Sequence, residues 1–193
     1  LITLNSDINL DYEDNDLYEK PAKRADDPTL NTALNNLNKY ISARISYDKL
    51  NVLNGDTIHN WLSVNSDGSV SISDEGVASF VKKVSNAYNT VGKPKTLKTS
   101  YGPTVTITGG SYGWKVNVEK EKAAIKSLIQ AGETAKREPE YSRKAASHGE
   151  NDYGNSYVEV NLTAQHMILI KNGSKVLESD FVSGNISKNW TTP

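Results

Sequence analysis

The chain of 193 residues contains no cysteine. Disulfide bonds and thiolate metal sites are therefore excluded. The fold must be predicted from the spacing of apolar residues and of turn residues alone. A chain without cysteine is also compatible with a bacterial protein that works outside the cytoplasm.

Length and charge narrow the class of protein. A chain of 193 residues can form one domain, or one domain and part of another. The net charge of −1 argues against nucleic-acid binding, because proteins that bind nucleic acid carry a basic stripe on their surface. No apolar run approaches the roughly 18 residues of a membrane-spanning helix, and no signal peptide opens the chain.

Two helices are predicted in the first half of the chain. The first follows an acidic connector, residues 1–26, and has Asp27 as its N-cap and Pro28 in its first turn. Its residues at helical spacing are Leu30, Ala33, Leu34, Leu37 and Ile41. The second is capped by Ser73, and its apolar stripe is Val77, Phe80, Val81, Val84 and Tyr88.

A third helix is predicted from about Glu119 to Ala131, with Gly132 as its stop signal. The residues expected to face inward are Ala123, Ala124, Leu128 and Ile129. Residues 133–155 are charged and lack apolar periodicity, so they indicate a linker or an extended segment between domains.

Strands are predicted between these helices. Residues 43–53 have extended character and end at an Asn54-Gly55 turn, and residues 57–62 form a short helix that carries Trp61. A second turn, Asp67-Gly68, lies between short apolar runs. Residues 105–108 alternate, and after Gly109-Gly110 residues 112–118 are expected to return as their partner strand.

The end of the chain predicts a small sheet. Residues 157–162 alternate apolar and polar side chains, and residues 166–170 form a second apolar run. Asn172-Gly173 is a strong signal for a type I′ hairpin turn, after which residues 174–182 return. Three strands are near the lower limit for independent stability, so we expect that the sequence ends inside a domain.

Catalytic and metal motifs are weak. The histidines are His59, His148 and His166, and no two of them lie within one helical turn, so no metal site is predicted. No Gly-x-Ser-x-Gly elbow supports a serine triad, and neither a P-loop nor a dinucleotide fingerprint is present. No cofactor is expected.

Three aromatic residues are the candidates for binding a ligand. Tyr101, Tyr112 and Trp114 are aromatic side chains with polar tips, which proteins use to hold sugars and apolar ligand faces. On a hairpin, Tyr112 and Trp114 would lie on the same face, where packing into the core is the commoner role. Both interpretations are open at this point.

Several motifs in the middle of the chain resemble a known family. They are Tyr88-Asn89-Thr90-x-Gly92, Leu97-x-Thr99-Ser100-x-Gly102, Val105, Gly109-Gly110 and Tyr112-Gly113-Trp114-x-Val116. Together they are similar to the peptidoglycan-binding domain found ahead of L,D-transpeptidase catalytic domains. Tyr-Gly-Trp after a double glycine is the most specific part, and the match covers roughly residues 41–141.

The tail resembles the first strands of the YkuD-type L,D-transpeptidase domain. The residues that carry this likeness are Val158-x-Val160-Asn161-Leu162, Gln165, Met167, Ile170-x-Asn172-Gly173, Val182-Ser183-Gly184 and Thr192-Pro193. The two modules in this order are similar to L,D-transpeptidases of Gram-positive bacteria, of the enterococcal type that bypasses β-lactams and so confers antibiotic resistance.

The resemblance implies an acyl transfer that cross-links peptidoglycan. In that family a cysteine thiolate attacks a donor tetrapeptide stem and expels D-Ala, and an acceptor amine then resolves the acyl-enzyme. The family's Cys and His-Gly motifs would fall beyond Pro193, so no catalytic residue is assigned in this chain and the 193 residues are expected to be inactive alone. Peptidoglycan stem peptides are the expected partner. The implied location is extracytoplasmic, at the cell wall, with a membrane anchor upstream of this chain.

The prediction is therefore an α+β protein, with helices on an antiparallel sheet followed by the first strands of a truncated, β-rich YkuD-type domain. The expected divisions are an acidic connector (1–26), a peptidoglycan-binding domain (27–141), a linker (142–155) and the start of the catalytic domain (156–193). The main alternative is a non-catalytic wall-binding or spacer module. A serine hydrolase without a recognised motif is a remote third.

Overall fold

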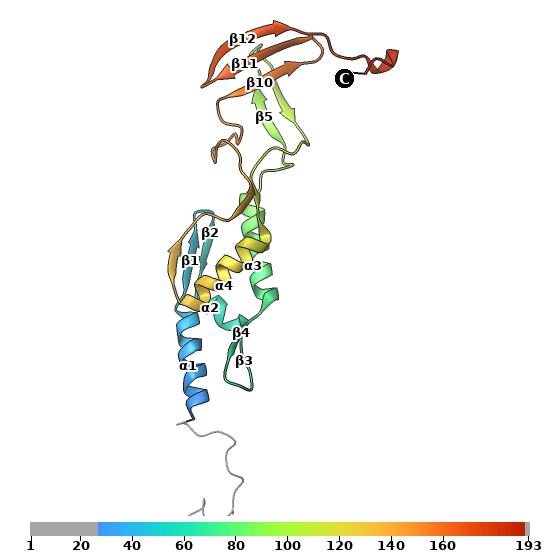
Figure 1. The fold of residues 1–193 in the computed structure, drawn as a ribbon. Helices are drawn as coiled ribbons and strands as arrows, with labels where there is room; N and C mark the ends of the chain where they lie inside the picture. The colour runs from blue at the N-terminus through green and yellow to red at the C-terminus, as the bar shows by residue number, and fades with distance from the viewer. Residues whose placement is uncertain (1–26, 192–193) are drawn as a thin grey trace, which may run out of the picture.

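A computed structural model describes residues 27–191 and shows an elongated α+β molecule, as the sequence predicts (Figure 1). One end holds all four α-helices, and the other holds a hairpin and a three-stranded sheet. The acidic connector and Thr192-Pro193 lie outside the described residues.

Helix α1 (Pro28–Ile41) begins as predicted. The Asp27 side chain accepts a hydrogen bond from the Thr29 N–H at 2.7 Å, which satisfies a donor that the first helical turn leaves free. Of the apolar residues at helical spacing, only Ala33 is buried, and Leu34 is 53% exposed.

A mixed sheet follows α1. Its order is β2-β1-β8, where β1 is Arg44–Tyr47, β2 is Leu50–Leu53 and β8 is Thr134–Lys136. β1 pairs with β2 antiparallel but with β8 parallel, so the expectation of a purely antiparallel sheet is wrong. Residues 133–155, expected to be a linker or an extended segment between domains, contain β8. Gly132, with φ 70, ends the preceding helix and turns the chain into β8 beside β1.

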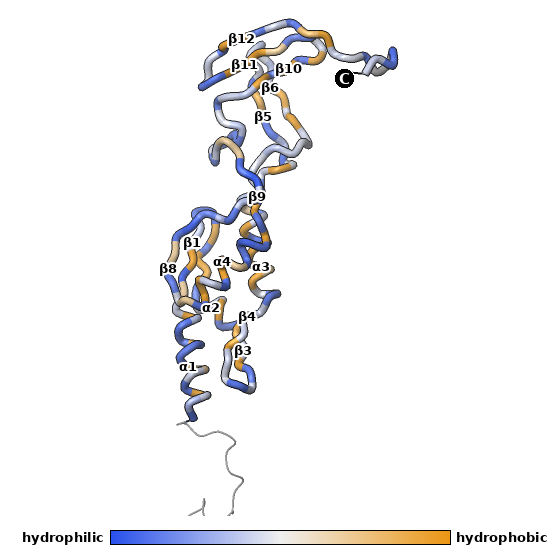
Figure 2. Tube along the Cα trace, in the orientation of Figure 1, coloured by the Kyte–Doolittle hydropathy of each residue, from blue (hydrophilic) through white to orange (hydrophobic). Residues whose placement is uncertain are grey.

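Helices α3 (Asp74–Tyr88) and α4 (Val118–Ala131) complete the core. The α3 stripe is buried as predicted, and the Ser73 hydroxyl caps the helix by accepting from the Gly76 N–H. The prediction for α4 is partly wrong, because Glu121 and Ile125 are buried with Ile129 while Ala123 is exposed. Figure 2 shows apolar stretches of α3, α4 and β1 beside one another.

The short elements after β2 agree with most of the sequence pattern. α2 (Gly55–Ile58) continues into a 3-10 turn, η1 (His59–Trp61), so Asn54-Gly55 begins the short helix rather than forming a separate turn. β3 (Leu62–Val64) and β4 (Val70–Ile72) form the hairpin predicted around Asp67-Gly68, with Gly68 at φ 81.

The strand that contains residues 105–107 pairs with a different strand from the one predicted. β5 (Lys95–Lys98) pairs with β6 (Thr104–Ile107), whereas β7 (Lys115–Val116) pairs with β9 (Tyr141–Arg143). Gly109, Gly110 and Gly113 have positive φ of 78, 78 and 139, which breaks the extended run that the sequence suggested. Tyr112 and Trp114 are therefore not two residues on one face of a hairpin strand.

The C-terminal sheet has the order β10-β11-β12, with β10 at Tyr157–Asn161, β11 at His166–Lys171 and β12 at Ser174–Asp180. Asn172 and Gly173 have φ of 52 and 79, which confirms the type I′ turn. A 3-10 turn, η2 (Ile186–Lys188), follows. Among residues 27–191, none of the helices has the length and apolarity that crossing a membrane requires.

Candidate functional site

The three predicted binding residues lie in three different surroundings. Tyr112 lines a cleft beside the β5–β6 hairpin, and Tyr101 lines a second cleft against the C-terminal sheet. Their side chains are 46% and 52% exposed. Trp114 is only 8% exposed. The structure therefore leaves two tyrosines accessible and places the tryptophan in a packed position.

Trp114 holds the segment that follows β9. Its indole stacks on His148 with ring centroids 3.8 Å apart and lies 4.6 Å from the Tyr141 ring. The indole N–H donates to the Ser147 carbonyl at 2.6 Å. Stacking and a satisfied N–H are the features of a structural tryptophan.

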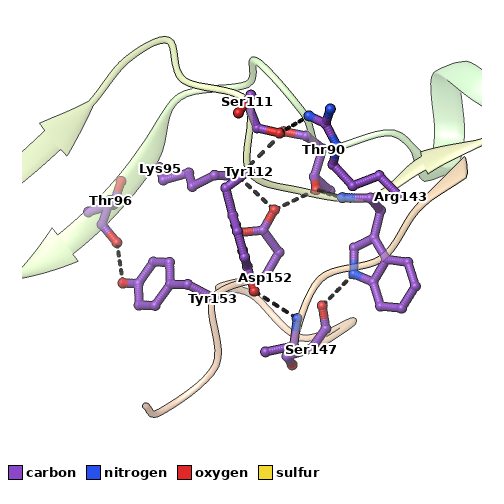
Figure 3. A network of polar contacts seen from close by, with 11 residues as sticks. Thr90, Lys95, Thr96, Ser111, Tyr112, Arg143, Ser147, Asp152 and Tyr153 are labelled. Carbon is purple, nitrogen blue, oxygen red and sulfur yellow. Dashed lines mark hydrogen bonds and ion pairs between the residues drawn. The ribbon is translucent and has the colours of Figure 1, made fainter. Parts of the chain in front are cut away.

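Asp152 is the centre of a polar network that joins the same segment to the β5–β6 region (Figure 3). Its carboxylate is 5% exposed, forms an ion pair with Lys95 at 2.6 Å and accepts a hydrogen bond from the Thr90 hydroxyl. The Thr90 hydroxyl oxygen in turn accepts a hydrogen bond from the backbone N–H of Trp114 at 2.9 Å. A buried carboxylate with such partners fixes the path of the chain, because its charge is costly to bury alone.

The Tyr112 cleft has a volume of about 370 Å³ and is largely aromatic and apolar. Tyr112, Tyr153 and Tyr157 line it together with Lys95 and the Gly109-Gly110 turn. The Tyr153 and Tyr157 rings meet edge to face at 5.2 Å and 77°. Such a volume lies within the roughly 300–1,000 Å³ that is usual for small-molecule sites.

The Tyr101 cleft is larger, about 530 Å³, and is more charged. Both carboxylate oxygens of buried Glu159 lie 3.0 Å from the Ser100 backbone nitrogen, which ties β10 to the loop that carries Tyr101. The charged or titratable side chains of His166, Lys175 and Glu178 also line this cleft, and His166 Nδ1 lies 2.7 Å from an Asp180 oxygen.

We expect a raised pKa at His166. The hydrogen bond to Asp180 favours the protonated imidazole, and Glu178 at 3.5 Å acts in the same direction, so the pKa of His166 lies above its ordinary value. Stabilisation from this group is present below the pKa of an unfolded histidine and is lost as pH rises through the raised folded value. Titration of the ring proton by NMR should show a lower pKa in Asp180→Asn. An unchanged pKa in that variant would contradict the assignment.

Each of the three histidines has a different partner in the described residues. His59 bonds the Gly55 carbonyl at 2.9 Å, His148 stacks on Trp114 and His166 pairs with Asp180. Within residues 27–191, no group of three potential ligands is arranged to hold a metal ion. The chain has no cysteine, so it offers no thiol nucleophile.

Sequence reasoning missed Lys95, Asp152, Tyr153 and Glu159. Residues 152 and 153 lie in a segment whose charge and glycine content resemble those of a solvated linker. A signal was present in Tyr153 and Tyr157, two aromatic residues close together at the end of that segment, since linkers are poor in aromatic residues.

Comparison with known proteins agrees with this architecture. A family model described as "Putative peptidoglycan binding domain" matches residues 26–136. Among solved structures, the chain is similar to the Ldtfm–avibactam carbamoyl enzyme, with a TM-score of 0.57 and 28% identity over 82% of this chain and 63% of that one.

A cysteine-to-serine mutant of the Enterococcus faecium L,D-transpeptidase is similar at a TM-score of 0.56 and 28% identity, over 83% of this chain and 64% of that one. The chain thus spans less than two thirds of the length of either structure. No curated protein matches it. Because the family model covers more than half of the sequence, this chain belongs to the peptidoglycan-binding domain family, and it is structurally related to the enterococcal L,D-transpeptidase.

Proposed function

We propose that this chain is the wall-binding and substrate-positioning part of an L,D-transpeptidase of the β-lactam-bypass type. The observation that carries the proposal is the order of its parts. A peptidoglycan-binding family match over residues 26–136 is followed by the β10-β11-β12 sheet, and 82% of the chain overlays on an L,D-transpeptidase structure.

The reaction proposed for the whole enzyme is cysteine acyl transfer. A thiolate attacks the donor tetrapeptide stem, D-Ala leaves, and the amine of an acceptor stem attacks the acyl-enzyme. The residues described above position peptidoglycan for this chemistry, because the two accessible tyrosines line clefts at the end of the molecule that carries the C-terminal sheet. The proposed location is the cell wall, outside the membrane, with an anchor supplied upstream.

The proposal predicts binding without catalysis. The 193-residue chain should co-sediment with purified sacculi. It should remain bound at high salt, because salt screens only non-specific binding through surface charges. D-Ala release from a tetrapeptide stem should equal that of buffer, because the chain holds no cysteine. Failure to bind sacculi would contradict wall binding, and D-Ala release above buffer would contradict the assignment of the nucleophile to a cysteine.

A spacer is the second candidate, and the elongated shape in Figure 1 favours it. A spacer would hold a catalytic domain at a distance without recognising a soluble substrate. A soluble disaccharide-tetrapeptide separates the two functions, because a positioning domain binds it and a spacer does not. Labelling by a serine-directed fluorophosphonate would instead indicate the serine hydrolase that the sequence left as a remote third.

A further inference from the structure

We propose that the Tyr112 cleft binds the uncharged glycan backbone of peptidoglycan, with an N-acetylhexosamine ring lying against the tyrosine rings. The inference rests on the proposed function and narrows it from peptidoglycan as a whole to one of its chemical parts.

The tyrosine rings of this cleft are held in place before any ligand arrives. The Tyr112 hydroxyl accepts a hydrogen bond from the Ala146 N–H at 2.9 Å, and the Tyr153 hydroxyl donates to the Thr96 carbonyl at 3.0 Å (Figure 3). Tyr157 packs edge to face against Tyr153. Fixed rings lose little conformational entropy on binding, and aromatic faces suit the apolar faces of sugar rings.

The Gly109-Gly110 turn leaves one wall of the cleft open. Both residues have φ of +78, and apart from the glycine and its two chain neighbours no atom lies within 4 Å of the position that a Cβ would occupy at either glycine. Without side chains, the backbone N–H and C=O groups of the turn are accessible to a ligand. A sugar that lies on the rings can therefore reach peptide groups for its hydroxyl and acetamido substituents.

Charge distinguishes the glycan from the stem peptide as the occupant. Lys95 is the one charged residue among the described residues that line the Tyr112 cleft, and its ammonium is already paired with Asp152 at 2.6 Å. The Tyr101 cleft instead presents His166, Lys175 and Glu178. The sugars of peptidoglycan are uncharged in the strand, whereas stem peptides carry carboxylates and amines. The aromatic cleft, whose one charged lining residue is already paired, thus fits the glycan.

The test is a titration of the ¹⁵N-labelled 193-residue chain with tetra-N-acetylchitotetraose, an uncharged chain of the amino sugar. We expect the amide resonances of Gly109 and Gly110 to shift. Tyr112→Ala should weaken binding about tenfold, the effect of removing one aromatic face. Tyr112→Phe keeps the ring but loses the hydrogen bond from the Ala146 N–H, so its affinity should lie between those of the parent chain and Tyr112→Ala. Tyr101→Ala is the matched control, because Tyr101 is similarly exposed but lines the other cleft.

Three results would overturn the inference. They are the absence of shifts at the two glycines, undiminished binding by Tyr112→Ala, and displacement of the oligosaccharide from these amides by a free tetrapeptide stem. The shifts in the unmodified chain test the site even if Tyr112→Ala does not fold. Sacculus binding separates the two proposals: if sacculi bind while the glycine amides do not respond, the wall-binding function stands and the glycan assignment fails.

Discussion

Glu121→Ala is expected to lower the free energy of unfolding by about 3–5 kcal/mol, the usual cost of breaking a buried charged pair by removing one partner. Glu121 lies on α4 and is fully buried. Its carboxylate accepts hydrogen bonds from the Tyr47 hydroxyl, from Arg137 at 3.2 Å and from the Glu140 N–H at 2.6 Å. One side chain therefore links α4 to β1 and to the segment after β8.

The loss of stability would come from the polar groups that Glu121→Ala leaves without their hydrogen-bond acceptor. Burial, and then the hydrogen bond to Glu121, raise the pKa of Tyr47, so this phenol stays protonated and is the donor. Without Glu121 the Tyr47 hydroxyl and the Glu140 N–H lose their buried acceptor. Arg137 retains its ion pair with the Glu140 carboxylate, which lies 3.4 Å from the guanidinium.

Urea unfolding followed by intrinsic fluorescence measures the effect. Glu119→Ala is the matched control, because Glu119 lies on the same helix with its side chain 80% exposed and should change stability by less than about 1 kcal/mol. Glu121→Gln keeps the shape and should fall between the two. Equal stabilities for the Glu121→Ala and Glu119→Ala chains would show that the buried network contributes nothing.

Helices α3 and α4 differ in how well apolar spacing in the sequence predicts their buried faces. The α3 stripe was predicted correctly because apolar spacing alone decides which face of that helix is buried. On α4 the buried face includes a carboxylate, so apolar spacing indicated a neighbouring face. A buried glutamate can be recognised only through its partners, and these are distant in the sequence.

Long-range pairing limited the rest of the prediction. The hairpins at Asp67-Gly68 and Asn172-Gly173 depend on local turn residues and were predicted correctly. β8 pairs in parallel with a strand far earlier in the chain, and no local signal specifies such a partner. For the site, Tyr112 was found from its motif, but Tyr153 and Tyr157 become its neighbours only once the segment after β9 folds back.

Trp114→Ala should destabilise the protein by about 3–5 kcal/mol, the range for removing a buried large aromatic side chain. The variant loses the stack on His148, the contact with Tyr141 and the hydrogen bond to Ser147. Because these partners lie in β9 and the segment after it, we expect that segment to become sensitive to limited proteolysis before the helical core does.

Trp114→Phe keeps a six-membered aromatic ring but removes the five-membered ring of the indole, so it retains part of the packing and none of the hydrogen bond to Ser147. We expect it to retain most of the stability and to remain bound to sacculi, because the tryptophan is buried and the two clefts that bear accessible tyrosines stay intact. The opposite pattern, an alanine variant with unchanged unfolding but no sacculus binding, would make Trp114 a ligand platform after all. Measuring both properties on the same variants decides between these roles, because a structural residue affects stability first and a platform affects only binding.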